Sequence, residues 1–423
     1  MQALILVGGE GTRLRPLTST VPKPVVPLVD RPFIAYMLEW LKRHGVDDVI
    51  MSCGFLATSV RNVLGDGSAY GLRLRFVEEP EPLGTGGALK YAEQFLEDRF
   101  LMLNGDTLTD IDLTAQIAQH EESGATGTLA LVPVSDPSSY GLVRLHDDHT
   151  VKGFLEKPSP DQIDTNLISA GAYVLERSVL DLIPAGQNVS IEREVWPRLV
   201  GNGLHGFVAD AYWMDIGTPQ RYLQGTFDIL EGNVASAVQQ RMGTSFLAVS
   251  DQAETLGRVV PPAVIERGVK VAPGAHVGSL VVLADGVQVG RNASIERSVV
   301  LQGTEIGADC TLRECIVGAG VRIGDGCEIS GGAVLGEGVT IGAGNVVSTG
   351  ARIFPGVNLP DGEVHAHLPL HSAEEQKQEI LGPVRLLKTK YSHNATLFPQ
   401  DAQTGGPARP QRVKARGVPF RVR

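Results

Sequence analysis

The chain has few cysteines, no surplus of basic residues and no long apolar run. Its four cysteines form no C-x-x-C pair, which argues against a disulfide framework and against a zinc cluster. The net charge of -11 disfavours nucleic acid as a partner, because phosphate backbones are bound by basic surfaces. No charged-then-apolar segment opens the chain, so the sequence predicts a cytoplasmic protein without membrane contact.

Residues 6–28, LVGGEGTRLRPLTSTVPKPVVPL, are rich in glycine but fit neither common phosphate-loop pattern. Leu14 stands where a dinucleotide fingerprint needs its third glycine, and no Gly-Lys-Ser/Thr follows as in a P-loop. Consecutive backbone N–H groups of such a turn still form a concave site for anions. Arg13 adds a permanently charged planar group, and two flanking prolines stiffen the backbone at Lys23. The loop is therefore predicted to bind a polyphosphate.

The first 235 residues alternate between apolar runs typical of strands and stretches typical of helices. This is the pattern of a mainly parallel sheet covered by helices. Ligands of such sheets bind at the carboxyl ends of the strands, where the glycine-rich loop begins. The predicted strands are 3–7, 48–53, 100–103, 127–132 and 170–175, and the predicted helices are 33–43 and 89–96.

After residue 258 an aliphatic residue recurs about every six positions, with two steps of five around Ile306 and Leu312. Such hexapeptide repeats stack short strands into a parallel β-helix with aliphatic columns inside. Cys310 and Cys327 occupy an inward place in this pattern, so we expect them to be buried and unreactive. The repeating positions are Ile265, Val271, Val277, Leu283, Val289, Ile295, Leu301, Ile306, Leu312, Val317, Ile323, Ile329, Leu335, Ile341, Val347, Ile353 and Leu359.

These patterns predict four segments. An α/β domain covers residues 1–235, a linker 236–258, a β-helix 259–363 and a tail 364–423. From Arg409 onward the tail has six basic residues and no acidic one. Its Pro, Gly and Gln content predicts that its C-terminal part is disordered and solvated, which we favour over a binding arm.

Two isolated aspartates complete the candidate site. Asp106 closes the apolar stretch RFLMLNGD, and Asp215 is the single carboxylate of the aromatic stretch YWMDIGTP. Mg²⁺ is usually held by one or two carboxylates together with phosphate oxygens of the substrate. A magnesium site is therefore predicted beside the glycine-rich loop.

At these positions the sequence resembles the sugar-1-phosphate nucleotidylyltransferases, also called nucleotide-sugar pyrophosphorylases. GGEGTRLRPLT (8–18) is similar to the opening signature of that family, and PKP (22–24) is similar to its next motif. EPEPLGTGGAL (79–89) resembles the base-binding stretch, and FLEKP and NLISAGAYVL resemble the sugar-binding motifs. Glu10, the Pro-Lys-Pro form and SIEREVWP (190–197) look most like the members that use GTP and mannose-1-phosphate.

The resemblance implies a Rossmann-like nucleotidyltransferase domain with a mixed, mainly parallel sheet, followed by a left-handed β-helix. The implied reaction transfers a nucleotidyl group from a nucleoside triphosphate, with GTP favoured, to a sugar-1-phosphate, with mannose-1-phosphate favoured. Arg13 and Lys23 would be its catalytic cations, and Asp106 and Asp215 would hold Mg²⁺. The implied nucleotide-binding residues are Gly8, Gly9, Gly11, Thr12, Gly84 and Thr85. The implied sugar-phosphate-binding residues are Gly141, Glu156, Lys157, Asn166 and Gly171.

Ser169 departs from the resemblance, because the family usually has Asn there. Nucleotidyl transfer to glucose-1-phosphate from UTP, dTTP or ATP therefore stays open, as does a non-catalytic, regulatory subunit that binds nucleotide sugars. Acyl transfer by the β-helix is disfavoured, since the repeats contain a single histidine, His276, without an evident partner. We expect the β-helix to hold a homo-oligomer and to contribute no chemistry.

Overall fold

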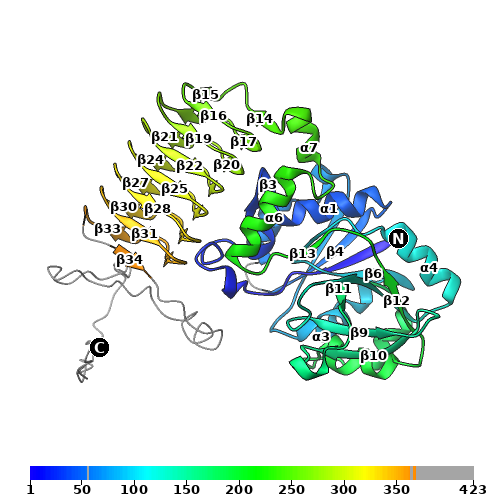
Figure 1. Ribbon diagram of the computed structural model, residues 1–423. Helices are drawn as coiled ribbons and strands as arrows, with labels where there is room; N and C mark the ends of the chain where they lie inside the picture. The colour runs from blue at the N-terminus through cyan, green and yellow to red at the C-terminus, as the bar shows by residue number, and fades with distance from the viewer. Residues whose placement is uncertain (55–56, 363–364, 368–423) are drawn as a thin grey trace, which may run out of the picture.

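The computed structural model describes residues 1–54, 57–362 and 365–367 of the chain. An N-terminal domain built around one sheet is followed by a stack of short coils (Figure 1). The stack stands beside the domain, with α6 near the contact between them. No helix in these described ranges is long and apolar enough to cross a membrane.

The N-terminal sheet has nine strands, of which four neighbours form a parallel half. In spatial order these are β5 (Arg73–Glu78), β4 (Asp48–Cys53), β1 (Gln2–Leu6) and β6 (Arg99–Asn104). β11 (Leu167–Glu176) runs antiparallel to β6 and begins the other half, so the sheet is mixed as predicted. The remaining strands are β8 (Gly127–Pro133), β9 (Gly141–Leu145), β10 (Val151–Glu156) and β12 (Leu204–Val208).

Helices cover both faces of this sheet. Ala3 and Ile5 of β1 face a cluster that includes side chains of α1, α2 and α4, whereas Leu4 faces α3 and α5. Because β1 is covered on both faces, its successive side chains have to be apolar, and its sequence is therefore a continuous apolar run. The helices are α1 (Phe33–Arg43), α2 (Ala57–Leu64), α3 (Gly84–Tyr91), α4 (Leu113–Ser123), α5 (Trp196–Leu199), α6 (Pro219–Glu231) and α7 (Ala237–Met242).

All five predicted strands are present, and their ends differ from the prediction by at most three residues. The helix predicted for 33–43 is confirmed as α1. The helix predicted for 89–96 is misplaced, because α3 already begins at Gly84 and ends at Tyr91. Its glycine-rich first turn is fixed by a distant contact, in which the Gly86 N–H donates to the Val189 carbonyl at 2.8 Å. The local pattern does not contain this contact.

The β-helix consists of three parallel sheets of seven strands, which form the three faces of its coils. This confirms the parallel β-helix that the repeat predicts and is consistent with the left-handed form that the resemblance implies. The first sheet contains β14 (Leu247–Val249), β17 (Ala263–Ile265), β20 (Val281–Leu283), β23 (Val299–Val300), β26 (Ile316–Val317), β29 (Val334–Leu335) and β32 (Arg352–Ile353). The second contains β15 (Glu254–Thr255), β18 (Lys270–Val271), β21 (Gln288–Val289), β24 (Glu305–Ile306), β27 (Arg322–Ile323), β30 (Thr340–Ile341) and β33 (Asn358–Leu359). The third contains β16 (Arg258–Val259), β19 (His276–Val277), β22 (Ser294–Glu296), β25 (Thr311–Arg313), β28 (Glu328–Ile329), β31 (Val346–Ser348) and β34 (His365–His367).

One predicted inward position is wrong. Val300, and not Leu301, aligns with Leu283 on one side and Val317 on the other, and it belongs to the interior of the β-helix. Two successive coils are therefore one residue shorter than the coil on either side of them, and the first step of five ends at Val300. Leu301 turns outward and joins the apolar cluster at the contact with the N-terminal domain.

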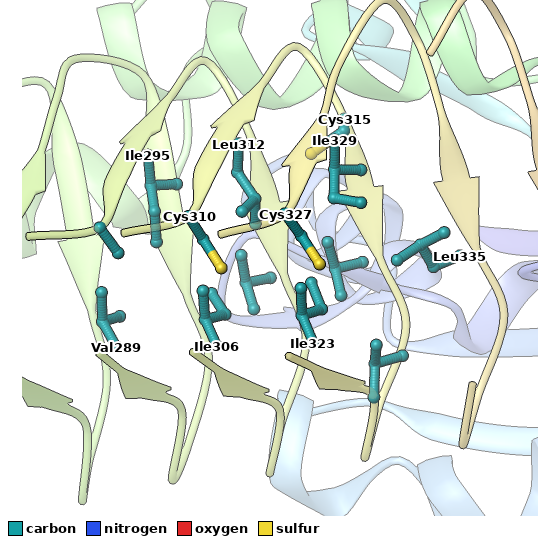
Figure 2. Close-up of a cluster of buried hydrophobic side chains, with 14 of the residues drawn as sticks. Val289, Ile295, Ile306, Cys310, Leu312, Cys315, Ile323, Cys327, Ile329 and Leu335 are labelled. Atoms are coloured by element: carbon teal, nitrogen blue, oxygen red, sulfur yellow. The ribbon is translucent and has the colours of Figure 1, made fainter. Parts of the chain in front are cut away.

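The packing role predicted for Cys310 and Cys327 is confirmed. Figure 2 shows both side chains inside the β-helix on successive coils, beside columns of aliphatic residues. The Cys310 thiol lies 3.1 Å from the Gly324 carbonyl oxygen, and the Cys327 thiol lies 3.0 Å from that of Gly342. All four cysteines are free and buried.

The segment 236–258 is not the linker that the sequence predicts. It contains α7 and most of the first coil, including β14, β15 and the start of β16, and these strands pair with the next coil. Terminal coils of a solenoid deviate from the repeat because they have a neighbour on one side only. Of the predicted tail 364–423, only β34 lies within the described residues, and the basic end lies outside them.

The first sheet of the β-helix packs against the N-terminal domain. Its outward residues share a buried cluster with Tyr222 and Phe227 of α6. Arg241 of α7 forms ion pairs with Asp30 of the N-terminal domain and, at 2.9 Å, with Glu266 of the β-helix. These contacts fix the β-helix against the domain that carries the predicted site.

Candidate active site

The predicted site residues gather in a cleft at the carboxyl ends of β1 and β6. The cleft has two cavities, of about 480 Å³ and about 160 Å³, and both are lined by Asn104 and Asp106. The larger cavity brings together Gly8, Gly9, Gly11, Thr12, Arg13, Lys23, Gly84, Thr85 and Asp106. The smaller cavity brings together Asp106, Gly141, Glu156, Gly171 and Asp215.

The opening loop, residues 8–24, forms the wall of the larger cavity after β1. Gly11 has a φ of 64°, a left-handed conformation that glycine adopts without steric cost, and it leads into the 3₁₀ turn Thr12–Leu14. The Thr18 hydroxyl donates to the Gly11 carbonyl at 2.7 Å and closes the loop on itself. Leu14 is buried beneath the turn, whereas the neighbouring Arg13 is exposed and lines the cavity.

Lys23 and Asp106 meet at the boundary between the two cavities. Lys23 begins the 3₁₀ turn Lys23–Val25, and its side chain is 10% exposed. Its Nζ lies 2.8 Å from Oδ2 of Asp106, whose side chain is 40% exposed. β6 ends at Asn104, so Asp106 lies in the tight turn after the strand and not at the strand end that the sequence predicts. This turn carries the carboxylate into the cleft beside the lysine.

Asp215 reaches the same place from a distant segment. It ends β13 (Trp213–Asp215), which pairs antiparallel with β7 (Thr107–Thr109) so that Asp215 faces Thr107. The Ile216 N–H donates to the Asp106 carbonyl at 2.9 Å, which places the two aspartates side by side. Arg221 of α6 donates to Oδ2 of Asp215 at 2.7 Å.

The environment of Asp215 fits a cation. Its Oδ1 is buried without a hydrogen-bond partner, and its side chain is only 13% exposed. Burial, followed by the negative charge of Asp106, raises the pKa of Asp215 above its usual value. A divalent ion between two carboxylates would satisfy the unpaired oxygen and relieve their repulsion. No group of three or more His, Cys, Asp or Glu side chains suited to a metal occurs among the residues that the structure describes.

The absence of a side chain at Gly217 leaves room for the side chains of Arg13 and Asp215. A Cβ at this position would lie 2.8 Å from Oδ1 of Asp215 and 2.9 Å from the guanidinium of Arg13. The opening loop and the segment after β13 therefore approach each other closely. Arg13, Lys23 and Arg221 surround the two aspartates from three different elements.

A carboxylate to which the sequence motifs assign no role, Glu79, also lines the larger cavity. Glu79 follows β5, and its Oε1 accepts a hydrogen bond from the Ser52 hydroxyl at 2.9 Å. The Leu83 N–H approaches its other oxygen at 3.3 Å, and the side chain lines the cavity beside Gly84 and Thr85. These contacts hold an acceptor group beside the predicted base-binding stretch.

A second such carboxylate lies in the smaller cavity. Glu192 belongs to a short π-helix, Ile191–Val195, a geometry frequent at functional sites. Its Oε2 accepts hydrogen bonds from the hydroxyls of Thr85 and Ser190, each at 2.7 Å. Burial, followed by the charge of Glu192, raises the pKa of Glu156 across the cavity. Thr85 thus connects the larger cavity to the acidic wall of the smaller one.

Gly171 permits the close packing of this wall. Its φ is 74°, and a Cβ there would lie 2.8 Å from the side-chain nitrogen of Asn104. The neighbouring Ser169 lines the cavity, and its hydroxyl lies 3.1 Å from that of Tyr173. The shorter residue at position 169 is thus part of the site itself.

Two predicted residues are not brought into the cleft. Lys157 has a φ of 53°, its N–H donates to the Tyr140 carbonyl at 3.0 Å, and its exposed side chain does not line either cavity. Asn166 is exposed, and its carbonyl accepts a hydrogen bond from the N–H of Val134, the residue after β8. Asn166 precedes the strand segment that reaches the cavity, which explains why Ser169 lines the site instead.

Two family models match the chain. The model described as nucleotidyl transferase matches residues 2–232, and the one described as GMPPB C-terminal domain matches residues 259–364. The chain belongs to the nucleotidyl transferase family. This enzyme is therefore a nucleotidyltransferase, and members of its family generally use a divalent metal. The second match covers the β-helix.

Several relatives are similar over most of the chain. A mannose-1-phosphate guanylyltransferase of Mycobacterium tuberculosis is 38% identical over 306 residues, which cover 70% of this chain and 83% of the relative. A UTP–glucose-1-phosphate uridylyltransferase of Synechocystis is 32% identical over 324 residues, which cover 70% of this chain and 84% of the relative. A mannose-1-phosphate guanyltransferase of Candida albicans is 41% identical over 234 residues, which cover 53% of this chain and 64% of the relative.

Proposed function

We propose that this nucleotidyltransferase transfers a guanylyl group from GTP to mannose-1-phosphate and forms GDP-mannose and pyrophosphate. The observation that carries this proposal is the junction of two cavities at Asp106, where three cations and two carboxylates converge. One cavity then takes the triphosphate and the other the sugar phosphate, with their phosphates at the junction. Relatives named for this reaction support the choice of substrates.

The proposed reaction needs no covalent intermediate. A phosphate oxygen of mannose-1-phosphate attacks the α-phosphorus of GTP, and the bond from that phosphorus to the oxygen bridging to the β-phosphate breaks. Pyrophosphate leaves with that oxygen and its electron pair. Both substrates are anionic, so the enzyme has to offset their repulsion while it holds them in line. Arg13 faces the larger cavity and Lys23 the junction, which suits the leaving pyrophosphate and the reacting phosphate respectively.

We propose Mg²⁺ as the divalent ion and Asp106 with Asp215 as its protein ligands. The unpaired Oδ1 of Asp215 and the adjacent carboxylate of Asp106 support this assignment. The bound ion would withdraw charge from the phosphate oxygens. Lys23 and Arg221 each hold one of the two carboxylates and thereby orient the pair.

Glu79 supports guanine as the base. The Watson–Crick edge of guanine presents two neighbouring N–H donors, which suit a carboxylate acceptor. Uracil and thymine present one N–H between two carbonyl oxygens, which a carboxylate repels. The Ser52 hydroxyl and the Leu83 N–H hold the Glu79 carboxylate in the wall of the larger cavity.

Glu156 and Glu192 support a sugar in the smaller cavity. Their oxygens can accept hydrogen bonds from sugar hydroxyls, and Ser169 adds a short hydroxyl to the same wall. Lys157 follows Glu156 directly but is exposed, so a role in binding the sugar phosphate would require its side chain to turn inward. Its left-handed backbone conformation is of a kind that gathers at ligand-binding sites.

A substrate screen tests the proposal. Purified enzyme with Mg²⁺ is assayed for pyrophosphate release with GTP, ATP, UTP, dTTP and CTP against mannose-, glucose- and N-acetylglucosamine-1-phosphate. We expect the highest kcat/KM with GTP and mannose-1-phosphate. A higher value with UTP, dTTP or ATP and glucose-1-phosphate would assign the enzyme to the alternative class that the Synechocystis relative represents. A matched Glu79→Gln variant is expected to lose preference for GTP over UTP.

We also propose that the β-helix joins two copies of this chain. Its second sheet carries a groove of about 680 Å³, and Leu256 beside the groove is 62% exposed. Light scattering on the full-length protein is expected to show more than one chain, and Leu256→Glu is expected to shift the mass toward the monomer. A monomeric wild type would reject the assembly.

A further inference from the structure

The β-helix touches the opening loop directly. Arg352 begins β32 in the last coil of the first sheet, and its Nη1 donates to the carbonyl of Arg13 at 3.0 Å and to that of Arg15 at 2.9 Å. These carbonyls flank Leu14, so the guanidinium clamps the backbone on both sides of the turn that carries Arg13. In Figure 1 the dark blue loop after β1 lies next to the coils that contain β32.

The Arg352 guanidinium bonds to the loop backbone and not to an acidic side chain. Within the described part of the chain Arg352 forms no ion pair, and burial lowers its pKa. A partly buried guanidinium gains most from partners that bond its N–H groups directly. The two loop carbonyls accept hydrogen bonds from Nη1, so loss of the loop conformation would remove these partners from a partly buried charge.

Other contacts hold the same loop against the β-helix. Leu14 and Leu17 belong to the apolar cluster that contains Leu301 and Val334 of the β-helix. The Thr20 hydroxyl donates to Glu337 in the coil before β32 at 2.7 Å. The loop is therefore packed between the two domains, and its geometry depends on both.

We infer that Arg352 is a positioning residue for nucleotidyl transfer, which acts by holding the backbone of Arg13 against the triphosphate. The β-helix then takes part in catalysis through this contact, contrary to the expectation that it contributes no chemistry. The inference rests on the proposed function for the role of Arg13. It requires that Arg352 affects the reaction through Arg13 and not through general stability.

A double-mutant cycle tests this in the full-length protein. Arg352→Met removes the donors and keeps the length of the side chain, and Arg352→Lys restores a charged donor. Arg313→Met is the control, because Arg313 is an exposed arginine on the third sheet of the β-helix, away from the proposed interface. We expect Arg352→Met to lower kcat about tenfold with KM nearly unchanged, Arg352→Lys to recover part of this loss, and Arg313→Met to retain wild-type kcat.

The decisive comparison uses Arg13→Ala as the background. If Arg352 acts through Arg13, adding Arg352→Met to Arg13→Ala changes kcat by less than twofold. An equal loss of kcat in both backgrounds, or an unchanged kcat in the single variant, overturns the inference. If Arg352→Met does not fold, the same comparison with Arg352→Lys decides. The assay uses whichever substrate pair the wild type turns over, so failure of GTP and mannose-1-phosphate alone rejects the proposed function and leaves this test intact.

Discussion

In the two domains, the residues that contact each other are separated by very different distances along the chain. In the N-terminal domain Arg13, Lys23, Asp106 and Asp215 come from four separate segments and meet at one junction. In the β-helix each residue packs mainly against positions one coil away, as Ile306 does between its neighbours on the second sheet. A single substitution can therefore stop the reaction in the first domain, whereas it removes one local set of contacts in the second.

The contact at Arg352 is an exception to this difference between the two domains. A solenoid that looks self-contained supplies two hydrogen bonds to the loop that carries a predicted catalytic residue. Packing in the β-helix is local, but its last coils also contact the loop that lines the cleft. Variants in the two domains can measure how far the separation between activity and stability holds.

The largest effect is expected at Asp106. Asp106→Asn keeps the size of the side chain and an acceptor for Lys23 but removes one charge from the proposed Mg²⁺ ligands. Activity that depends on Mg²⁺ should fall more than about a thousandfold, because a catalytic metal contributes several kcal/mol. Steady-state assays with and without EDTA measure this, and Asp147→Asn, on an exposed loop, is the control. Full activity in Asp106→Asn would reject the metal assignment.

Arg13→Ala is expected to have the next largest effect. Turnover should fall about a hundredfold while the fold is retained, since one lost electrostatic contact to the transition state is worth about 3 kcal/mol. The exposed Arg61 of α2 provides a matched control as Arg61→Ala. Steady-state kinetics separate kcat from KM. A raised KM with unchanged kcat would mean that Arg13 binds substrate without acting on the transition state.

Ile323→Ala is expected to affect stability and not chemistry. Ile323 is 4% exposed inside the β-helix, and its truncation should lower the free energy of unfolding by about 3 kcal/mol. Val63→Ala, at a position on α2 that is 50% exposed, should change it by less than about 0.5 kcal/mol. Denaturant unfolding measures both, and kcat at 25 °C should equal that of the wild type. A large loss of kcat in folded Ile323→Ala would show that the interior of the β-helix controls the cleft.

The same difference in distance explains what the sequence could predict. The repeat of the β-helix is local, so it predicts the buried columns. It fails at Leu301 because the coil there is one residue shorter, so Val300 takes the inward place and Leu301 packs toward the other domain. The opening loop, Lys23 and both aspartates carry motifs that predict their place in the cleft. The inward position of Ser169 and the exposure of Asn166 depend on where β11 enters the sheet, which no local pattern contains.

Some functional residues lie within motifs and still give no signal of their role. Glu79 and Glu192 fall in the stretches 79–89 and 190–197, yet a glutamate there is equally compatible with a solvated surface. Their roles follow from hydrogen bonds to Ser52 and Thr85, which are distant in sequence. Arg352 lies in an ordinary repeat of the β-helix, and only the packing of the two domains shows that it reaches the loop.

The smallest effect is expected at His120, in the N-terminal domain but away from the cleft. Its ring is fully buried, with Nδ1 2.8 Å from the Thr128 hydroxyl and Nε2 3.1 Å from Glu176. These contacts suit a neutral ring that accepts at Nδ1 and donates at Nε2. Burial lowers the pKa of His120 from its usual 6.5, although Glu176 opposes this shift.

Because the pKa of His120 is lowered in the folded protein, the stability of the fold should decrease as the pH falls. A lowered pKa means that the unfolded chain binds the proton first as the pH falls below 6.5, so the stability that the neutral ring provides is lost between there and the pKa of the folded state. Thermal unfolding from pH 7 to pH 5 should therefore show a smaller drop in Tm for His120→Gln than for the wild type, and His146→Gln, at an exposed position, should follow the wild type. Some pH dependence should persist in His120→Gln, because burial also lowers the pKa of His44. Equal drops in Tm for His120→Gln and the wild type would mean that His120 does not contribute, and kcat at pH 7 should be unchanged in either case because its side chain does not line the cleft.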